Sequence, residues 1–417
     1  MSKRQQRRAE IVGRLSAGGM SKIEAGLLLG LGRRQVDRVL SAYRDRGIAS
    51  VVHGNAGRVP VNKTPSEVLA QVVSLVGEGG KYHDFAVCHA CDQLEENEAI
   101  RIGRSTLDRL LRSEGIICSR ESTDKTKRKR RQRASAEGAM LQIDASPHDW
   151  LECRGPKMAL VGAVDDATGK IVYGVFRPTE DLPGYLMMLR GISRTYGLPE
   201  SVYHDRHTIL RSPKPATIQD ELAGTEPQSQ FQRVLSELGI TSIAAGSPQA
   251  KGRIERVWKT LQNRLVKEMR LAQVSTIEQA NAFMPGFINR YNKRFGREPA
   301  DENTAWVKME PNTDLDYYFC ARERRVVRSD HTIAWHGKIL QITPDSRSRS
   351  LAGVAVNVHQ TPEGDILLYD DKRRLQYRSL PSLSRTATHA KPKPTATTPD
   401  PSALARRRAW LFAQPAA

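Results

Sequence analysis

The spacing of apolar positions divides the chain into helical and strand-forming regions. In residues 33–47, RRQVDRVLSAYRDRG, the apolar residues Val36, Val39, Leu40 and Tyr43 follow the i, i+3, i+4, i+7 pattern of one buried helix face. A shorter apolar helix precedes this stretch and begins with the capping box S-K-I-E. A helix, a short glycine turn and a basic second helix predict a helix-turn-helix unit, whose second helix enters the major groove of DNA.

A second helical unit repeats this arrangement. Its predicted helices are capped by Thr64-Pro-Ser-Glu67, run from about Asp84 to Glu96, and begin again at Arg104. Arg and Gln side chains can pair bidentately with guanine and adenine edges. The candidates for DNA contact are Arg33, Arg34, Gln35, Arg38, Arg104 and Arg109. The alternative for each unit is a plain helical bundle with a solvated basic face, but two such units ahead of a basic linker favour DNA binding.

From residue 139 the pattern changes to alternating, β-branched segments. MLQIDAS and MALVGAVDDATGKIVYGVF predict three strands with a hairpin turn at Asp166-Ala-Thr-Gly169. The continuation predicts the order α, β, α, β, α, which gives a mixed sheet flanked by helices. Residues 274–296 predict a further helix, broken or kinked near Pro285. Short alternating strands between 316 and about 380 predict a small β-barrel.

These patterns predict a multidomain chain with all-α helix-turn-helix units, a central α/β core and a small C-terminal β-barrel. The expected divisions are 1–60 and 61–118 for the two helical domains, 119–137 for a basic linker, 138–300 for the core, 301–381 for the barrel and 382–417 for a disordered tail.

The amino-acid composition indicates what kind of molecule the chain binds. The 417 residues include 65 Lys+Arg and 46 Asp+Glu, a net charge of +19, which suits a polyanion such as nucleic acid. A membrane surface is the competing partner, but no apolar run approaches the ~20 residues that a spanning helix needs. The N-terminus has no apolar signal core, so we expect no export. Five cysteines fit a reducing cytosol, and Cys88-His-Ala-Cys91 has no second ligand pair of the kind that zinc sites use.

The linker KTKRKRRQR, from Lys125 to Arg133, is too densely charged to pack into a core. It is either a solvated or localisation-like tract, or an arm that follows DNA phosphates and adds salt-sensitive affinity. Both readings can hold together. The candidate phosphate contacts are Lys127, Arg128, Lys129, Arg130 and Arg131.

Three acids occupy the tips of predicted central elements. Asp144 lies in LQIDAS, Asp205 ends the strand VYHD, and Glu255 lies at the start of a long helix. Carboxylate oxygens bind Mg²⁺, and two such ions can support in-line displacement at a phosphate. For Glu255 the alternative is an i,i+4 ion-pair face, since it lies in the basic run SPQAKGRIERVWK. The basic and polar candidates beside it for backbone contact are Gln249, Lys251, Arg253, Arg256 and Lys259.

Other acids and histidines compete for these roles. Turn chemistry explains Asp165 and Asp166 without a metal. Asp149 follows Asp144 closely and is expected to leave the strand. His204 and His207 flank Asp205, where either contacts phosphate or orients the acids, or has a surface or packing role.

The run SPQAKGRIER, with QIDAS and YHDRHT upstream, resembles the DDE transposase and retroviral-integrase superfamily, and more narrowly bacterial insertion-sequence transposases of the ISNCY type. The resemblance covers all but the tail and implies an RNase H-like integrase core. It also implies that Asp144, Asp205 and Glu255 bind two Mg²⁺ ions, with Mn²⁺ as a substitute, and that no covalent protein–DNA intermediate forms.

The function expected from these features is a transposase. It would bind terminal inverted repeats, cleave 3′ ends and transfer strands, as a homo-oligomer on double-stranded DNA of the transposon ends and target, in the bacterial cytoplasm at the nucleoid and not on a membrane. Two alternatives stay open: a catalytically inactive sequence-specific DNA-binding regulator, and an RNase H-like nuclease that only hydrolyses.

Overall fold

A computed structural model gives the structure of the chain and describes residues 3–52, 63–116, 132–213, 222, 227–246, 252–343 and 350–380. The chain divides into two compact units, Met1–Glu121 and Ser122–Ala417. The predicted tail and most of the predicted linker lie outside the described residues. No helix in the described ranges combines the length and the apolar character needed to cross a membrane.

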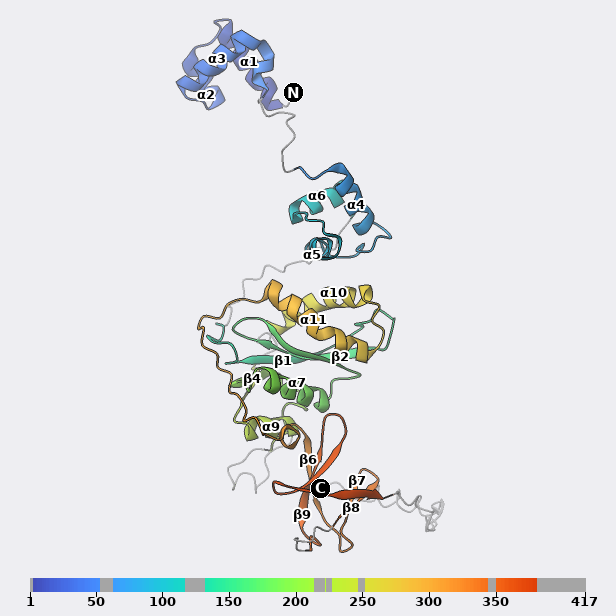
Figure 1. Cartoon of the computed structure of the whole chain (residues 1–417). Helices are drawn as coiled ribbons and strands as arrows, with labels where there is room; N and C mark the ends of the chain where they lie inside the picture. The colour runs from blue at the N-terminus through green and yellow to red at the C-terminus, as the bar shows by residue number, and fades with distance from the viewer. Residues whose placement is uncertain are drawn as a thin grey trace, which may run out of the picture. The chain divides into compact units, whose positions relative to one another are not determined.

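The first unit is helical, as the periodicity predicted (Figure 1). Its elements are α1 (Lys3–Ser16), α2 (Lys22–Leu29), α3 (Arg33–Arg46), the 3-10 turn η1 (Gly47–Val51), α4 (Ser66–Val76), α5 (Val87–Glu98) and α6 (Arg104–Ser113). The predicted capping box of α2 is confirmed, because the Ser21 hydroxyl accepts from the Glu24 N–H at 3.2 Å and the Glu24 carboxylate accepts from the Ser21 N–H at 2.9 Å. Gly30, at φ 64°, ends α2 in the left-handed conformation that glycine adopts without strain.

One predicted cap of the second helical group is wrong. α4 begins at Ser66 with Pro65 in the capping position, and no side chain caps it. Proline fits there because its fixed φ starts a helix and its missing N–H would have no intrahelical partner. Leu107 and Leu111 of α6 are fully buried, as their spacing predicted.

The second unit is built on the mixed sheet that the alternating segments predicted. Its strands are β1 (Leu141–His148), β2 (Met158–Asp165), β3 (Ile171–Arg177), β4 (Ser201–His204) and β5 (Thr241–Ala244), in the order β3-β2-β1-β4-β5. β1, β2 and β3 pair antiparallel, whereas β4 is parallel to both β1 and β5. The predicted hairpin turn lies between β2 and β3.

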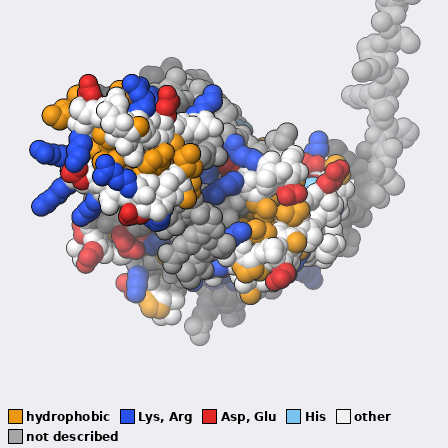
Figure 2. Space-filling view, turned by 90° about the horizontal axis from the view of Figure 1, so that it is seen from above, with side chains coloured by type: hydrophobic (Ala, Val, Ile, Leu, Met, Phe, Trp, Pro, Cys, Tyr) orange, Lys and Arg blue, Asp and Glu red, His pale blue; other side chains and the backbone are white. Residues whose placement is uncertain are grey.

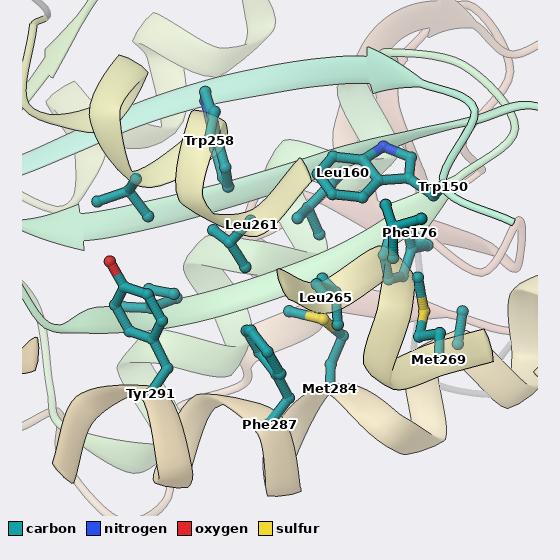
Figure 3. Close-up of a cluster of buried hydrophobic side chains, with 14 of the residues drawn as sticks. Trp150, Leu160, Phe176, Trp258, Leu261, Leu265, Met269, Met284, Phe287 and Tyr291 are labelled. Carbon is teal, nitrogen blue, oxygen red and sulfur yellow. The ribbon is translucent and has the colours of Figure 1, made fainter. Parts of the chain in front are cut away.

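Helices cover both faces of this sheet (Figure 1). They are α7 (Leu182–Thr195), α9 (Gln230–Glu237), α10 (Ile254–Leu271) and α11 (Ile277–Phe295). α10 and α11 bury one face, where Trp258 and Leu261 of α10 meet Phe287 of α11 in one apolar cluster (Figure 3). α7 and α9 bury the other face, together with Leu141 and Ile143 of β1. Since side chains alternate along a strand, the intervening residues of β1 face α10.

α11 runs unbroken through Pro285, so the predicted break is absent. Two asparagines attach this helix to β3, an outer strand of the sheet. The Asn292 side chain accepts from Ile171 N–H and donates to Ile171 C=O, both at 2.8 Å, and Asn281 makes the same pair of bonds with Phe176 at 2.7 and 3.1 Å. These bonds satisfy backbone groups that an outer strand would otherwise leave open.

The C-terminal strands form two sheets and no closed barrel within the described ranges, so the barrel prediction is wrong. The elements are α12 (Leu315–Tyr318), β6 (Ala321–Val326), β7 (Thr332–Trp335), β8 (Lys338–Ile342), β9 (Ala355–Gln360), β10 (Ile366–Asp370), β11 (Arg373–Leu375) and β12 (Tyr377–Leu380). The sheet orders are β11-β10-β9-β6 and β12-β8-β7. Both sheets contribute to one apolar cluster, which explains why alternation alone suggested a barrel.

Candidate active site

Two of the predicted acids belong to neighbouring parallel strands: Asp144 lies within β1, and Asp205 directly follows β4. β1 pairs with β4 so that Leu141 is opposite Val202 and Gln142 is opposite Tyr203. Extending this register by two residues places Asp144 opposite Asp205, just after the end of β4. Neighbouring strands are about 4.8 Å apart, so a continuation of this register would set the two carboxyl-bearing residues side by side.

Trp258 of α10 fixes the orientation of Asp144. Its indole N–H donates to the Asp144 carboxylate at 3.0 Å. The far edge of the ring lies over Gly162, the residue of β2 that pairs with Asp144. A Cβ at Gly162 would stand only 2.8 Å from the Trp258 ring, so this position needs glycine for the indole to reach the carboxylate.

The start of α10 is attached to the sheet by a buried polar group. The Gln142 side chain accepts from the Ile254 N–H at 3.2 Å and donates to the Asp166 carboxylate at 2.6 Å. Asp166 is 1% exposed and also contacts the Arg253 guanidinium. A buried carboxylate is stable when it is paired and hydrogen-bonded, and here those partners hold the helix start.

Glu255, the third predicted acid, is exposed on the first turn of α10. Trp258 follows it by three residues and lies on a neighbouring part of the same helix surface. No three His, Cys, Asp or Glu side chains in the described ranges are close enough to hold a metal ion. The β1–β4 register thus aligns Asp144 with Asp205, and within the described ranges Glu255 does not join them in a three-acid group. The oxygen-only donors of the pair suit Mg²⁺.

A buried tyrosine of α7 is hydrogen-bonded to another acid and is near enough to both aspartates to feel their charge. The Tyr185 hydroxyl donates to the Glu180 carboxylate at 2.7 Å. Burial, then Glu180, and then the charges of Asp144 and Asp205 raise the pKa of Tyr185, so it stays a neutral donor. His207 lies 3.8 Å from Glu180, and its backbone N–H donates to Asp205 at 3.0 Å. His207 is exposed beside Asp205 and Glu180, which agrees equally with an orienting role and with a surface role.

The competing residues have structural roles. Asp165 is buried and accepts from the backbone N–H groups of Gly138 and Thr168 at 2.9 and 2.8 Å, which confirms the turn interpretation. Burial raises the pKa of Asp165. His204 is buried, and its ring contacts the Ser242 hydroxyl at 2.8 Å. Asp149 lies beyond the end of β1, as expected.

The predicted DNA-contacting side chains of the first unit are exposed. Figure 2 shows Lys and Arg side chains, in blue, projecting from the visible described surface. The exposed candidates are Arg33, Arg34, Gln35, Arg38, Arg104 and Arg109. The side-chain carbonyl of Gln35 also accepts from the Gly32 N–H at 3.4 Å, a helix-capping contact.

The basic candidates near Glu255 differ in environment. Arg256 and Lys259 are exposed, whereas Arg253 is held by Asp166. Gln249 and Lys251 lie outside the described residues, as do Lys127, Arg128, Lys129, Arg130 and Arg131.

Sequence reasoning missed Trp258, Gln142 and Tyr185. The tryptophan and tyrosine read as core residues because they occupy apolar helix positions. The signal that could have singled out Gln142 is a polar residue in the otherwise apolar strand LQIDAS, where a buried amide needs partners.

Comparisons with known proteins show which proteins this chain is similar to. It is 33% identical over 392 residues to the putative transposase y4bF of Sinorhizobium fredii (strain NBRC 101917 / NGR234), covering 94% of this chain and 84% of that protein. It is 28% identical to the transposase for insertion sequence IS1202 of Streptococcus pneumoniae, covering 79% of this chain and 76% of that protein.

Solved structures with detectable likeness include the catalytic core domain of BIV integrase (TM-score 0.28, 17% identity, 39% of this chain and 88% of that one). Another is the simian T-cell lymphotropic virus intasome in complex with PP2A regulatory subunit B56 gamma (TM-score 0.32, 14% identity, 68% of this chain and 94% of that one). No family model matches the chain. Because it is 33% identical to a transposase over most of the length of both chains, and similar to an insertion-sequence transposase as well, the chain belongs to the bacterial transposases.

Proposed function

We propose that this chain binds the terminal inverted repeats of an insertion sequence, frees a 3′-hydroxyl at each end and joins it to target DNA. The observation that carries the proposal is the Asp144–Asp205 pair, set by strand register and oriented by Trp258. We further propose an RNase H-like core within 138–300, preceded by DNA-binding helical domains at 1–60 and 61–118.

Asp144, Asp205 and Glu255 would hold Mg²⁺, or Mn²⁺ in its place. When bound, the ions supply the Lewis acidity that in-line displacement at a phosphodiester needs. Gathering the three acids requires Glu255 to approach the pair, and its exposed place on the first turn of α10 leaves its side chain accessible for this.

The residues of the chain supply orientation and electrostatics. Trp258 restrains the Asp144 carboxylate, and Tyr185 keeps Glu180 hydrogen-bonded beside the pair. The exposed cations of the helical units and of α10 hold the DNA backbone. Water is the attacking group in the first step and the freed 3′-hydroxyl in the second. Because two ends must be joined, we propose a homo-oligomer on DNA, acting in the bacterial cytoplasm.

The test uses the full chain, Mg²⁺ and labelled duplexes that carry the inverted repeats flanking its gene. Strand-transfer products support the proposal. Cleavage alone indicates a nuclease, and binding alone indicates a regulator. Asp144→Asn should abolish cleavage and keep binding, as should chelation of the metal. The matched control is Asp149→Asn, which changes an acid beyond the end of the same strand and should keep activity. Cleavage by the Asp144→Asn protein would refute the assignment.

A further inference from the structure

A cavity of about 140 Å³ opens beside the start of α10, and four arginines line it. They are Arg133, Arg253, Arg256 and Arg297, from the end of the basic linker, from α10 and from the segment after α11. Thr168, Thr260 and Phe295 complete much of the wall, and no described acidic side chain lines it. At about 30 Å³ per water, the cavity holds roughly four or five waters, enough room for a phosphate group.

The cavity is rigidly built on three sides. The Arg133 guanidinium donates to the backbone carbonyls of Asp166 and Ala167 at 2.8 and 3.2 Å. The Arg253 guanidinium contacts the buried Asp166 carboxylate. The backbone N–H of Arg297 donates to the Thr168 carbonyl at 3.0 Å. Two of the guanidinium groups, those of Arg133 and Arg253, are therefore held in place before any ligand arrives, which lowers the ordering cost of binding.

The charges in the cavity repel one another. Burial, followed by the nearby guanidinium groups of Arg253 and Arg297, lowers the pKa of Arg133. Arg253 has the Asp166 carboxylate against it, but the exposed Arg256 and Arg297 add positive charge that Asp166 alone does not neutralise. An anion inside the cavity would relieve this repulsion. Guanidinium groups in particular match the geometry of phosphate oxygens.

The cavity lies on a different side of α10 from the acids. Arg253, Arg256, Val257 and Thr260 follow the i, i+3, i+4, i+7 spacing of one helix face. At 3.6 residues per turn, Glu255 lies about half a turn away from that face. The cavity is thus a second site and not part of the aspartate pair.

We infer that this cavity binds one backbone phosphate of DNA that leads away from the reacting phosphodiester. The inference rests on the proposed function for the identity of the polyanion. Arg133 is the last residue of KTKRKRRQR, so a DNA strand that follows this basic linker would reach the cavity directly. The same arginines could take a free phosphate ion, and the experiment separates the two sources.

The experiment compares two full-length double variants by fluorescence anisotropy of a labelled duplex, with metal chelated so that cleavage plays no part. Arg256→Ala/Arg297→Ala removes two exposed charges from the cavity. The control, Lys293→Ala/Arg294→Ala, removes two exposed charges from the last turn of α11, outside the cavity. Arg253 is left intact because its replacement would remove the cationic partner of the buried Asp166 carboxylate.

The cavity variant should bind every duplex more weakly, and its plot of log K against log salt should be shallower by about 1, as for one lost phosphate contact. Arg256→Lys/Arg297→Lys should restore most of the salt dependence, because it restores the charge. Equal effects of the cavity and control variants would overturn the inference. So would a cavity variant that loses binding of inorganic phosphate, measured by calorimetry, while its DNA affinity is unchanged.

This readout is independent of catalysis. A chain that binds DNA through the cavity but never cleaves it would refute the proposed function and leave the phosphate site standing. If instead the parent chain cleaves DNA, but the cavity variant binds DNA with the same salt dependence as the parent, the phosphate site is refuted and the proposed function stands.

Discussion

Replacing Trp258 with phenylalanine tests whether the indole N–H holds Asp144 in a working orientation. Trp258 is 6% exposed, and its N–H lies 3.0 Å from the Asp144 carboxylate. Phenylalanine keeps an aromatic ring in the apolar cluster but removes the donor. A hydrogen bond to a charged group contributes about 1.5–3 kcal/mol, and the smaller ring leaves a partial void. We expect a total loss of about 2–4 kcal/mol in the free energy of unfolding.

The effect on activity should exceed the effect on stability. Without the indole N–H, the Asp144 carboxylate loses a restraint on its orientation, and misplacement of about 1 Å costs roughly a hundredfold in rate. Cleavage of a labelled repeat end should therefore fall about a hundredfold at a temperature where the variant is folded, while DNA affinity stays near that of the parent.

Trp150→Phe is the matched control. Trp150 is buried in the same cluster, and its indole N–H donates to the Ser146 carbonyl at 3.0 Å, a neutral acceptor. Loss of this hydrogen bond should lower the free energy of unfolding by about 0.5–1.5 kcal/mol, in addition to the effect of the smaller ring on packing, and should leave cleavage near normal. Denaturant unfolding and the cleavage assay together decide the matter. Equal loss of cleavage in both variants would refute the reasoning, because it would make the defect one of general packing.

Three further changes test other contacts, two in the core and one in the C-terminal sheets. Gly162→Ala should force the Trp258 ring away, lower stability by about 1–3 kcal/mol and reduce cleavage, as measured by thermal unfolding and end cleavage. Asp166→Asn should cost about 3–5 kcal/mol in a denaturant titration, because it leaves the Arg253 charge without its buried partner. Burial and neighbouring arginines lower the pKa of His359 to about 3, so the unfolded chain takes up this proton first as the pH falls. Stability should be full above about pH 6.5 and fall by up to about 1.4 kcal/mol per pH unit toward pH 3, and His359→Phe should flatten this dependence of the unfolding free energy.

The elements of the core could be predicted because each carries its own periodicity. The β2 strand is apolar on both faces, as a central strand covered by helices must be, and the alternation of β1 shows which residues face α10. The same reasoning placed Asp205 at a strand end, where it directly follows β4, but its placement of Asp144 at a strand tip was wrong, because Asp144 lies within β1. The alignment of the two acids could not be predicted, because it depends on the pairing of β1 with β4, and no local pattern encodes that register.

The predictions that failed depended on packing between distant segments. The C-terminal strands alternate as those of a barrel do, but whether a sheet closes depends on tilt and register that alternation does not record. Arg253 was predicted to contact DNA because it lies in a basic run, and that stays a prediction, but no sequence pattern indicated its contact with Asp166, which is 87 residues away. Charge patterning identifies cations, but it does not show which of them are already neutralised.

The strand face that carries Asp144 also carries Gln142, and this links the two sites of the core. Gln142 bonds both to Asp166, beside the arginine-lined cavity, and to the first N–H of α10, while Asp144 lies two residues further along the same face. Two residues of a strand span about 6.6 Å, so β1 sets the distance between the cavity wall and the aspartate pair. A DNA phosphate held in the cavity would therefore be at a fixed distance from the acids. Changes at Asp166 should disturb the core itself as well as DNA binding, because Asp166 holds both Gln142 and Arg253, whereas changes at the exposed Arg256 should alter cleavage only through weaker DNA binding.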